Sequence, residues 1–228
     1  MNILYVNYWG INEGLTQATT LPNLKLLNGD CRTTKVVFTT IERESKEVST
    51  YDALGKVLHL PLYSSASLLS KFADFTVFPK RLIKLCRKHQ IDKIIARGAP
   101  TGGIAWLVFR KTKIPFIVES YEPHADYMLS GGTWSKNSLK YRVQKFLEKR
   151  QKQHASGLIP VAYNYQNKLM NEGIHADKIA VAPCSVDTEQ FFLDKKKREE
   201  IRTAFKYSSS TVVGIYVGKF GAIYYREE

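Results

Sequence analysis

Several signatures of metal and disulfide sites are missing from this sequence of 228 residues. The three cysteines lie far apart and form no Cys-x-x-Cys pair. This spacing argues against a disulfide framework or a zinc site, and it indicates buried or incidental thiols in a reducing compartment. The five histidines form no His-Glu-x-x-His motif, and no Asp-x-Asp pair occurs in the chain. We therefore predict that the protein holds no metal ion.

Motifs of two common classes of nucleotide-binding protein are also missing. The loop after the first predicted strand reads WGINEG and lacks the G-x-G-x-x-G pattern of dinucleotide oxidoreductases. No G-x-x-x-x-G-K-[ST] sequence is present, which excludes a P-loop. The chain therefore belongs to neither of these two classes.

Long hydrophobic runs are absent as well. No apolar run approaches the roughly 18 to 20 residues that a membrane span requires. The opening residues MNILYVN have neither a basic region nor a long apolar core, so they predict a β-strand rather than a signal peptide. We expect a cytoplasmic protein, either free or peripheral at the inner face of the cell membrane.

Positive charge is concentrated in one segment of the chain. The net charge is +13, and residues 67–154 contain 18 lysines and arginines against 6 acidic residues. The remainder of the chain is nearly neutral. This distribution favours an anionic partner, although a solvated face that only keeps the protein soluble would give the same composition.

Short β-rich runs alternate with helix-like stretches along most of the chain, and 44% hydrophobic residues suffice for a real core. This alternation predicts an α/β fold, a Rossmann-like three-layer α/β/α domain with a mainly parallel sheet of about seven strands. The predicted strands are residues 2–8, 34–40, 56–60, 92–96, 115–119, 157–161 and 178–182. The predicted helices are residues 16–28, a helix that begins at Pro79, and residues 102–111, 139–154 and 163–172.

The character of the sequence changes after Asp187. A dense charge cluster, KKKREE, leads into a short helix and then into a polar connector of the kind that joins domains. Residues 211–217 then form a β-rich run that stops at a Gly-rich turn, which is typical of a strand that opens a βα unit. We expect an N-terminal Rossmann-like domain over residues 1–190, a linker over 191–210 and the start of a truncated second domain over 211–228.

Polar residues gather at the predicted carboxyl ends of three strands, the edge where open α/β sheets bind ligands. Gly14 lies in the first such loop, where backbone N–H groups could approach an anion at a helix start. Arg97 opens the second loop, which would read equally well as a tight entry turn. The third segment, ESYEPHADY, is the most crowded, although a lone histidine is often structural. Its candidate site residues are Glu119, Glu122, His124 and Asp126.

The chain resembles a family 4 glycosyltransferase of the GT-B type. The resemblance rests on the first strand with its Gly loop and on three further stretches: VESYEPHADYM, the long run from GLIPV to DTEQF, and GIYVGKFG. The most specific piece is KIAVAPCSVDTEQF, where the family typically has Pro-Asn-Gly-Val-Asp and a downstream Phe. This sequence departs from that pattern at Cys184 and Ser185. The match covers the chain as the first half of such an enzyme, so residues 211–217 resemble the first strand of its second domain.

The resemblance implies an activity and a division of labour. The first domain of this family binds mainly the acceptor, and the second binds a nucleotide-sugar, which is the co-substrate; no other cofactor is implied. A sugar would pass to a polysaccharide or a lipid-linked acceptor, by a reaction that is metal-independent and retaining. The resemblance also implies that this chain alone lacks turnover, because most donor contacts belong to the second domain.

Site roles follow from the same resemblance. His124 matches a histidine that the family presents to the transferring sugar, and Gly14 matches a glycine near the donor phosphates. Lys219 stands where the family often has an arginine on the donor diphosphate; lysine keeps the charge but loses the planar fork. Residues of the first domain that are expected to bind acceptor are Arg97, Glu119, Glu122 and Asp126.

Two other classes of function stay open. Aromatic and basic residues interleave in residues 71–87 and 140–152, as in nucleic-acid-binding modules. No DNA- or RNA-binding motif is present, however, so nucleic acid is the less favoured anionic partner. The cleft of such an enzyme can also support a nucleotide-sugar hydrolase or epimerase, which the sequence does not exclude.

The helix predicted at residues 139–154 suits an anionic lipid surface. Projected at about 100° per residue, an apolar stripe lies beside a sector of cations, a pattern that can rest on a membrane. The stripe consists of Leu139, Val143, Phe146 and Leu147, and the cations are Arg142, Lys145, Lys149 and Lys152. An aromatic-rich stretch precedes the other basic helix and contains Tyr63, Phe72, Phe75 and Phe78. These phenylalanines would equally suit a core, and the cations a solvated face.

Overall fold

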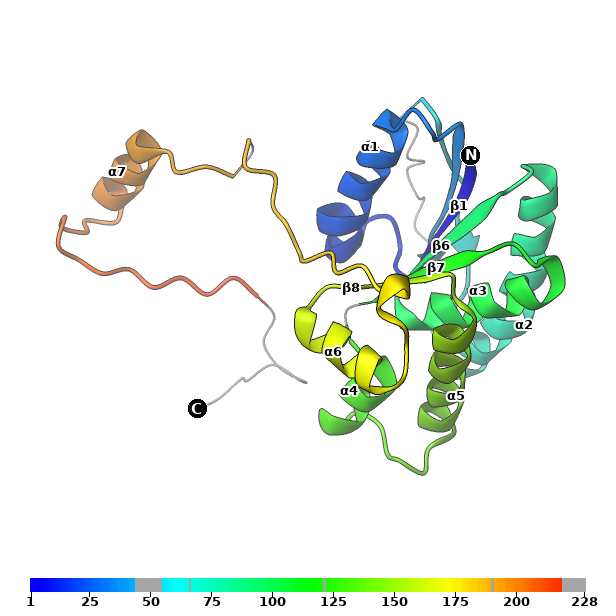
Figure 1. Cartoon of the computed structure of the whole chain (residues 1–228). Coiled ribbons are helices and arrows are strands. Elements are labelled where there is room, and N and C mark those ends of the chain that lie inside the picture. The colour runs from blue at the N-terminus through cyan, green and yellow to red at the C-terminus, as the bar shows by residue number, and fades with distance from the viewer. Residues whose placement is uncertain (44–54, 66, 121, 190, 219–228) are drawn as a thin grey trace. The chain divides into compact units, whose positions relative to one another are not determined.

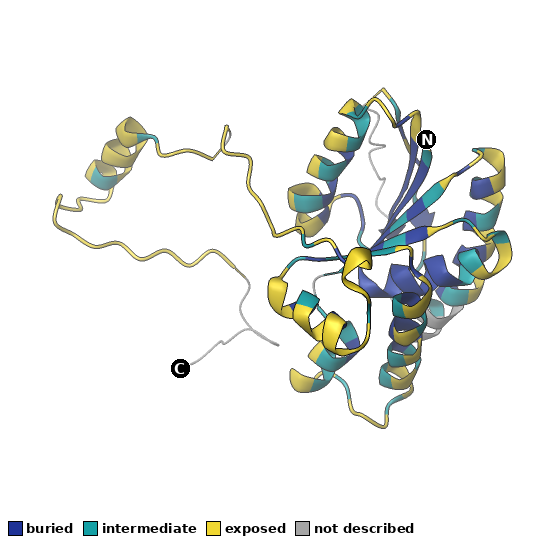
Figure 2. Ribbon diagram, viewed as in Figure 1, coloured by how far each residue is buried: buried dark blue, intermediate teal, exposed yellow. Residues whose placement is uncertain are grey.

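The computed structural model describes residues 1–43, 55–65, 67–120, 122–189 and 191–218 (Figure 1). The chain divides into two compact units, Met1–Pro183 and Cys184–Glu228. The first unit contains the sheet, its covering helices and nearly all of the buried residues, as Figure 2 shows.

The first unit is built on a parallel sheet of six strands in the order β4-β2-β1-β6-β7-β8. Every pair of neighbours in this sheet is parallel. The strands are β1 (Asn2–Asn7), β2 (Lys35–Thr39), β4 (Val57–His59), β6 (Lys93–Arg97), β7 (Phe116–Ser120) and β8 (Gly157–Pro160). A separate parallel pair joins β3 (Ile41–Glu42) to β5 (Leu62–Tyr63). The expected mainly parallel Rossmann-like sheet is confirmed.

Helices cover both faces of the sheet and complete the three layers. One face packs on α1 (Leu21–Gly29), which follows the π-helical turn η1 (Thr16–Thr20). The opposite face packs on α2 (Leu68–Lys88), α3 (Ala99–Thr112), α5 (Leu139–His154) and α6 (Tyr163–Asn171). The remaining helices are α4 (His124–Ser130), the 3-10 turn η2 (Ala176–Lys178) and, in the second unit, α7 (Lys195–Ala204).

Side chains of β1 alternate between two apolar cores. Leu4 and Val6 join the core beneath α2, α3 and α5. Ile3 and Tyr5 join the smaller core beneath α1. Because successive strand residues point to opposite faces, a strand covered on both sides must be apolar throughout, as NILYV nearly is.

The seventh predicted strand, residues 178–182, lies along β8 without forming a full ladder. A single bridge joins Leu158 to Ile179, and the N–H groups of Ala180 and Ala182 donate to carbonyls of β8 at 3.0 Å. Pro160 lies in β8 and has no N–H with which to return the next bond of the ladder. Within the described ranges, the sheet therefore has six strands and an extended segment along one edge.

Two other expectations about elements are wrong. Pro79 lies inside α2, which begins earlier at a serine cap: the Ser67 hydroxyl accepts a hydrogen bond from the N–H of Ser70 at 3.2 Å. Residues 211–217 form no strand in the described part of the second unit, where Val212 and Val217 are 95% and 91% exposed. A β-rich run becomes a strand only when a neighbouring strand accepts and donates its backbone bonds.

Close packing of α5 on α3 depends on two adjacent glycines. A Cβ atom added at Gly102 would lie 1.6 Å from Oε1 of Gln151 and 3.0 Å from Cγ1 of Val118. A Cβ atom at Gly103 would lie 3.0 to 3.3 Å from three atoms of Leu147. The two helices approach this closely because neither glycine carries a side chain.

We predict that Gly102→Ala lowers the free energy of unfolding by about 1–3 kcal/mol, since the methyl group must displace the buried Gln151. Gly29→Ala serves as the control, because nothing lies within 4 Å of a Cβ at that position. Urea denaturation of the two variants measures the difference. Equal stability of both variants would contradict the close packing.

Candidate functional site

A cavity of about 110 Å³ lies at the carboxyl edge of the sheet, on the side of α2, α3 and α5. It is bounded by the end of β1, the residues around β3, and four helices or their adjoining loops. The apolar part of its lining consists of Tyr8, Ile41, Phe75, Pro100, Ile104, Trp134 and Val143. The polar part consists of Arg43, Asp74, His124, Lys140 and Gln144.

His124 enters this cavity from the first position of α4. Its side chain is 27% exposed, and Nδ1 lies 3.3 Å from Oε1 of Glu122. The Trp134 ring meets the imidazole edge-on, with ring centres 5.5 Å apart and planes at 89°. The contact with Glu122 engages one ring nitrogen, so Nε2 is the atom that can exchange a hydrogen bond with a ligand.

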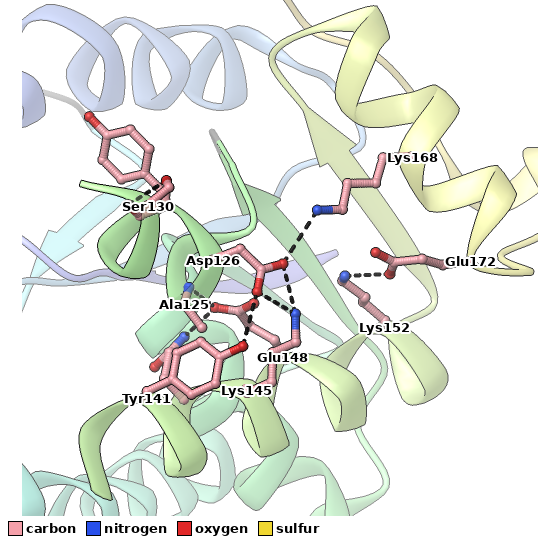
Figure 3. Close-up of polar contacts among 11 residues, drawn as sticks. Ala125, Asp126, Ser130, Tyr141, Lys145, Glu148, Lys152, Lys168 and Glu172 are labelled. Atoms are coloured by element: carbon pink, nitrogen blue, oxygen red, sulfur yellow. Dashed lines mark hydrogen bonds and ion pairs between the residues drawn. The ribbon is translucent and has the colours of Figure 1, made fainter. Parts of the chain in front are cut away.

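The backbone beside His124 is held by a glutamate from another helix. Pro123 precedes α4 and offers no side-chain cap. Instead, Oε1 of Glu148 accepts hydrogen bonds from the N–H of Ala125 at 2.8 Å and from Nε2 of Gln144 at 3.0 Å. Figure 3 shows this carboxylate reaching from α5 to the start of α4. A helix N-terminus that its own sequence leaves uncapped is thus satisfied through tertiary structure.

Glu148 is buried, with 3% of its surface exposed. Burial raises the pKa of its carboxyl group, and the hydrogen bonds from Gln144 and Ala125 offset part of that rise. Its second oxygen, Oε2, has no hydrogen-bond partner among the described residues. Gln144 also lines the cavity, so a continuous polar connection runs from the cavity through Glu148 to the residue after His124.

Asp126 joins three helices (Figure 3). Nζ of Lys145 lies 2.6 Å from its Oδ1, Nζ of Lys168 lies 3.3 Å from its Oδ2, and the Tyr141 hydroxyl donates to Oδ1 at 3.4 Å. Burial by itself would raise the pKa of Asp126, but the two lysines outweigh it, so the pKa is lowered. Both carboxylate oxygens are thus engaged within the protein, and an acceptor-binding role for Asp126 stays a prediction.

Arg97 and Glu119 form a buried ion pair away from the cavity. They are register partners on β6 and β7, and they point to the α1 face of the sheet. The Tyr5 hydroxyl donates to Oε2 of Glu119 at 2.9 Å, and Asn23 of α1 donates to Oε1 at 3.4 Å. Burial and the neighbouring carboxylate raise the pKa of Tyr5. The structure therefore brings Glu122 to His124 and separates Arg97 and Glu119 from both.

The two predicted donor contacts stay predictions. Gly14 lies at a helix start rather than in a loop; it is exposed, and an added Cβ there would meet nothing within 4 Å, so the space beside it is open. Lys219 lies outside the described residues.

The four cations predicted as one anionic-surface sector have different surroundings. Lys145 pairs with Asp126, and Lys152 pairs with Glu172 at 2.6 Å. Arg142 and Lys149 are exposed. These two side chains are therefore the available cations of the proposed surface.

The predicted apolar stripe of α5 is partly buried in the domain and partly exposed. Leu147 is buried, but Leu139 and Phe146 are 63% and 49% exposed. The helix also buries three polar side chains: Glu148 accepts hydrogen bonds from α4 and from Gln144, and Gln151 packs against Gly102 of α3. Of the aromatic stretch before the other basic helix, Phe78 is core, Phe75 lines the cavity and Tyr63 is exposed, while the side chain of Phe72 lies outside the described part.

Sequence reasoning missed most of the cavity. Tyr8, Arg43, Trp134 and Lys140 come from four separate segments and carry no shared spacing. Only Tyr8 had an available signal, since it directly follows the first strand at the edge where ligands bind.

Searches for a metal cluster and for a membrane span were negative within the described ranges. No group of three or more potential metal-ligating residues occurs there. Within the same ranges, none of the helices combines the length and apolarity needed to pass through a bilayer.

The fold is a Rossmann-like three-layer α/β/α domain with a cavity at the carboxyl edge of its parallel sheet. The family model of Glycosyltransferase Family 4 matches residues 36–190, which is more than half of the chain. The chain belongs to this family. No curated protein sequence matches it.

Solved structures share the fold at low sequence identity. Sucrose-phosphate synthase from Thermosynechococcus elongatus matches with a TM-score of 0.67 and 10% identity, over 92% of this chain and 54% of its own. HepE from Anabaena, solved with UDP, matches with a TM-score of 0.57 and 12% identity, over 90% and 50%. UDP-GlcNAc 2-epimerase from Neisseria meningitidis, bound to UDP-GlcNAc, matches with a TM-score of 0.56 and 18% identity, over 90% and 53%. The chain thus spans about half the length of these proteins.

We predict that Glu148→Ala lowers the free energy of unfolding by about 1–3 kcal/mol, because the N–H of Ala125 loses its buried acceptor. The same change should accelerate hydrogen exchange of the Ala125 amide at least tenfold. Glu148→Gln keeps an acceptor oxygen and should retain most of the protection. Unchanged exchange of Ala125 in Glu148→Ala, measured by NMR, would show that this hydrogen bond contributes nothing.

The lowered pKa of Asp126 leads us to expect a specific dependence of stability on pH. Because its pKa is lowered in the folded protein, its stabilisation is present above its unfolded value of 3.8 and is lost as pH falls through the folded pKa. Asp126→Asn should therefore be less stable by about 0.5–1 kcal/mol at pH 7, and the difference should vanish in acid. Glu13→Gln is the control, since Glu13 is exposed and forms no ion pair with the described residues. Denaturant midpoints of both variants and of the unchanged protein are measured from about pH 2 to 7, the range in which carboxyl groups titrate. A stability difference between Asp126→Asn and the unchanged protein that does not vary with pH would refute the ion-pair role.

Proposed function

We propose that this chain is the acceptor-binding half of a glycosyltransferase that transfers a sugar from a nucleotide-sugar to a polysaccharide or lipid-linked acceptor. The observation that carries the proposal is the position of His124. The imidazole of His124 lies in a cavity at the carboxyl edge of the sheet, and the chain belongs to glycosyltransferase family 4. Ligands of open α/β sheets bind at this edge.

The donor is proposed to be a nucleoside-diphosphate sugar. HepE was solved with UDP-glucose, and the epimerase from Neisseria meningitidis with UDP-GlcNAc. Gly14 is exposed and lies at a helix start, a suitable place for backbone N–H groups to face a phosphate. Lys219 would supply a cation to the same diphosphate. A second Rossmann domain would contribute most of the remaining donor contacts, so the chain by itself is proposed to be inactive.

His124 is the residue proposed to act at the reacting sugar. Glu122 engages Nδ1 at 3.3 Å and Trp134 packs against the ring, so the orientation of the imidazole is constrained before any ligand binds. An oriented Nε2 can hold a sugar hydroxyl or accept its proton. Negative charge that develops on the departing diphosphate would be stabilised by cations and helix N-termini, in a metal-independent and retaining transfer.

A nucleotide-sugar 2-epimerase is the second candidate. It is supported by the fold shared with UDP-GlcNAc 2-epimerases, one of them at 18% identity. One assay separates the candidates: UDP-sugars are incubated with and without saccharide and lipid acceptors, using both the 228-residue chain and the longest open reading frame that contains it. Transfer that requires an acceptor supports the transferase, whereas an isomerised nucleotide-sugar without acceptor supports the epimerase. Transfer by the 228-residue chain alone would contradict the proposed division of labour.

We predict that His124→Ala lowers kcat for transfer by about one to three orders of magnitude and leaves the unfolding midpoint unchanged, because His124 contacts the substrate rather than the core. His175→Ala is the matched control, since the His175 side chain is 75% exposed and lies far from the cavity lining in sequence. Loss of stability with an unchanged kcat would identify His124 as a structural residue.

A further inference from the structure

We propose that the cavity beside His124 binds an amphipathic anion: an apolar group of a few carbon atoms attached to a phosphate or carboxylate. This inference rests on the proposed function and specifies the acceptor class at the same site: the acceptor carries this apolar group and anion in addition to the hydroxyl group that receives the sugar. The ligand would place its apolar group between α2, α3 and α5, and its anionic group beside Lys140.

The lining of the cavity supplies the first reason. Ile41, Phe75, Ile104 and Val143 present only carbon atoms, and the rings of Tyr8 and Trp134 add aromatic surface. Ile104 is 1% exposed, so the inner wall belongs to the core of the domain. An apolar group that enters such a cavity leaves water, which is the main source of affinity in mostly apolar sites.

The pairing of the polar lining residues supplies the second reason. Nη1 of Arg43 lies 2.8 Å from Oδ2 of Asp74, and Nε2 of Gln144 donates to Glu148 at 3.0 Å. Arg43 and Asp74 are thus engaged with each other, and Gln144 with Glu148 behind the lining, which leaves His124 and Lys140 as the polar lining residues for a ligand. A ligand whose buried part is apolar needs no more hydrogen-bond partners than these two residues supply, and it leaves both pairs intact.

Lys140 supplies the third reason. It is an exposed cation of the first turn of α5, and it lines the cavity. The structure gives it no ion pair or hydrogen bond with the described residues, whereas Arg43 is paired with Asp74. An anionic group attached to the bound apolar group would therefore meet an available ammonium group at the cavity.

The volume limits the size of the apolar group. An engineered cavity of roughly 150 Å³ is known to hold one benzene molecule. A cavity of about 110 Å³ therefore accommodates a group of a few carbon atoms, and any longer chain must extend toward solvent.

The test uses the 228-residue chain and measures binding by calorimetry, with four probes. Hexyl phosphate combines both features, hexyl glucoside lacks the anion, glycerol phosphate lacks the apolar group, and glucose 6-phosphate is a hydroxylated anion. Hexyl phosphate should bind at least tenfold more tightly than each of the other three. Equal or tighter binding of glucose 6-phosphate or hexyl glucoside would overturn the proposal.

Three variants locate the binding. Lys140→Gln should weaken hexyl phosphate binding severalfold and leave hexyl glucoside unchanged. Val143→Trp fills the cavity and should abolish hexyl phosphate binding, with the unfolding midpoint as a check on folding. Lys149→Gln removes an exposed cation of the same helix that does not line the cavity, so it should have no effect. Equal loss with Lys149→Gln and Lys140→Gln would show nonspecific charge attraction and overturn the site.

A second arm distinguishes a soluble ligand from a lipid. Phosphatidylcholine vesicles with and without dihexadecyl phosphate are sedimented with the protein. Binding to hexyl phosphate but not to the vesicles that contain dihexadecyl phosphate identifies a soluble amphipathic anion. Binding to hexyl phosphate and also to these vesicles identifies a lipid phosphate. These measurements do not depend on catalysis.

Failure of this proposal can be distinguished from failure of the proposed function. If hexyl phosphate fails to bind while transfer to another acceptor is observed, the acceptor class is wrong and the transferase stands. If hexyl phosphate binds and no transfer occurs in the longer protein, the proposed function is wrong and the binding site stands.

Discussion

The close contact between α3 and α5 at Gly102 and Gly103 determines where the polar side chains of α5 lie. Without side chains at these two positions, Leu147 and Gln151 can pack directly against α3. Glu148 lies between these two residues and reaches the start of α4, where its Oε1 accepts a hydrogen bond from the N–H of Ala125. The cavity, the histidine and the short helix that presents it therefore share one packing constraint.

Burial of Glu148 on α5 desolvates a carboxyl group, but it also places two hydrogen bonds beside His124. A carboxylate at 3% exposure is desolvated, and its pKa rises accordingly. The hydrogen bonds to Ala125 and Gln144 offset part of that cost and fix the backbone next to His124. Asp126 acts on the same short helix from its exposed side, through lysines of α5 and α6. A helix of seven residues, too short to be stable alone, is thus held at both of its faces.

Glu119 and Glu122 are close in sequence within ESYEPHADY, but their side chains lie in different environments. Glu122 stays beside His124, while Glu119 turns to the opposite face of the sheet and pairs with Arg97. The alternation of side chains along β7 accounts for this difference, because Val118 joins the larger core and Glu119 must then point to the α1 face. Proximity in sequence at a strand end is therefore a poor guide to shared chemistry.

The sequence by itself determined the α/β class, the parallel sheet and its edge, because the apolar runs of β1, β6 and β7 can be buried only by helices on both faces. It also singled out His124 at that edge, through a resemblance to family 4 glycosyltransferases. Tertiary structure alone decided the rest: that residues 178–182 lie along β8 as an extended segment, that Glu148 replaces the cap which Pro123 cannot provide, and that Trp134 and Lys140 meet in one cavity. These outcomes depend on contacts between segments far apart in the chain, and no local periodicity or spacing encodes such contacts.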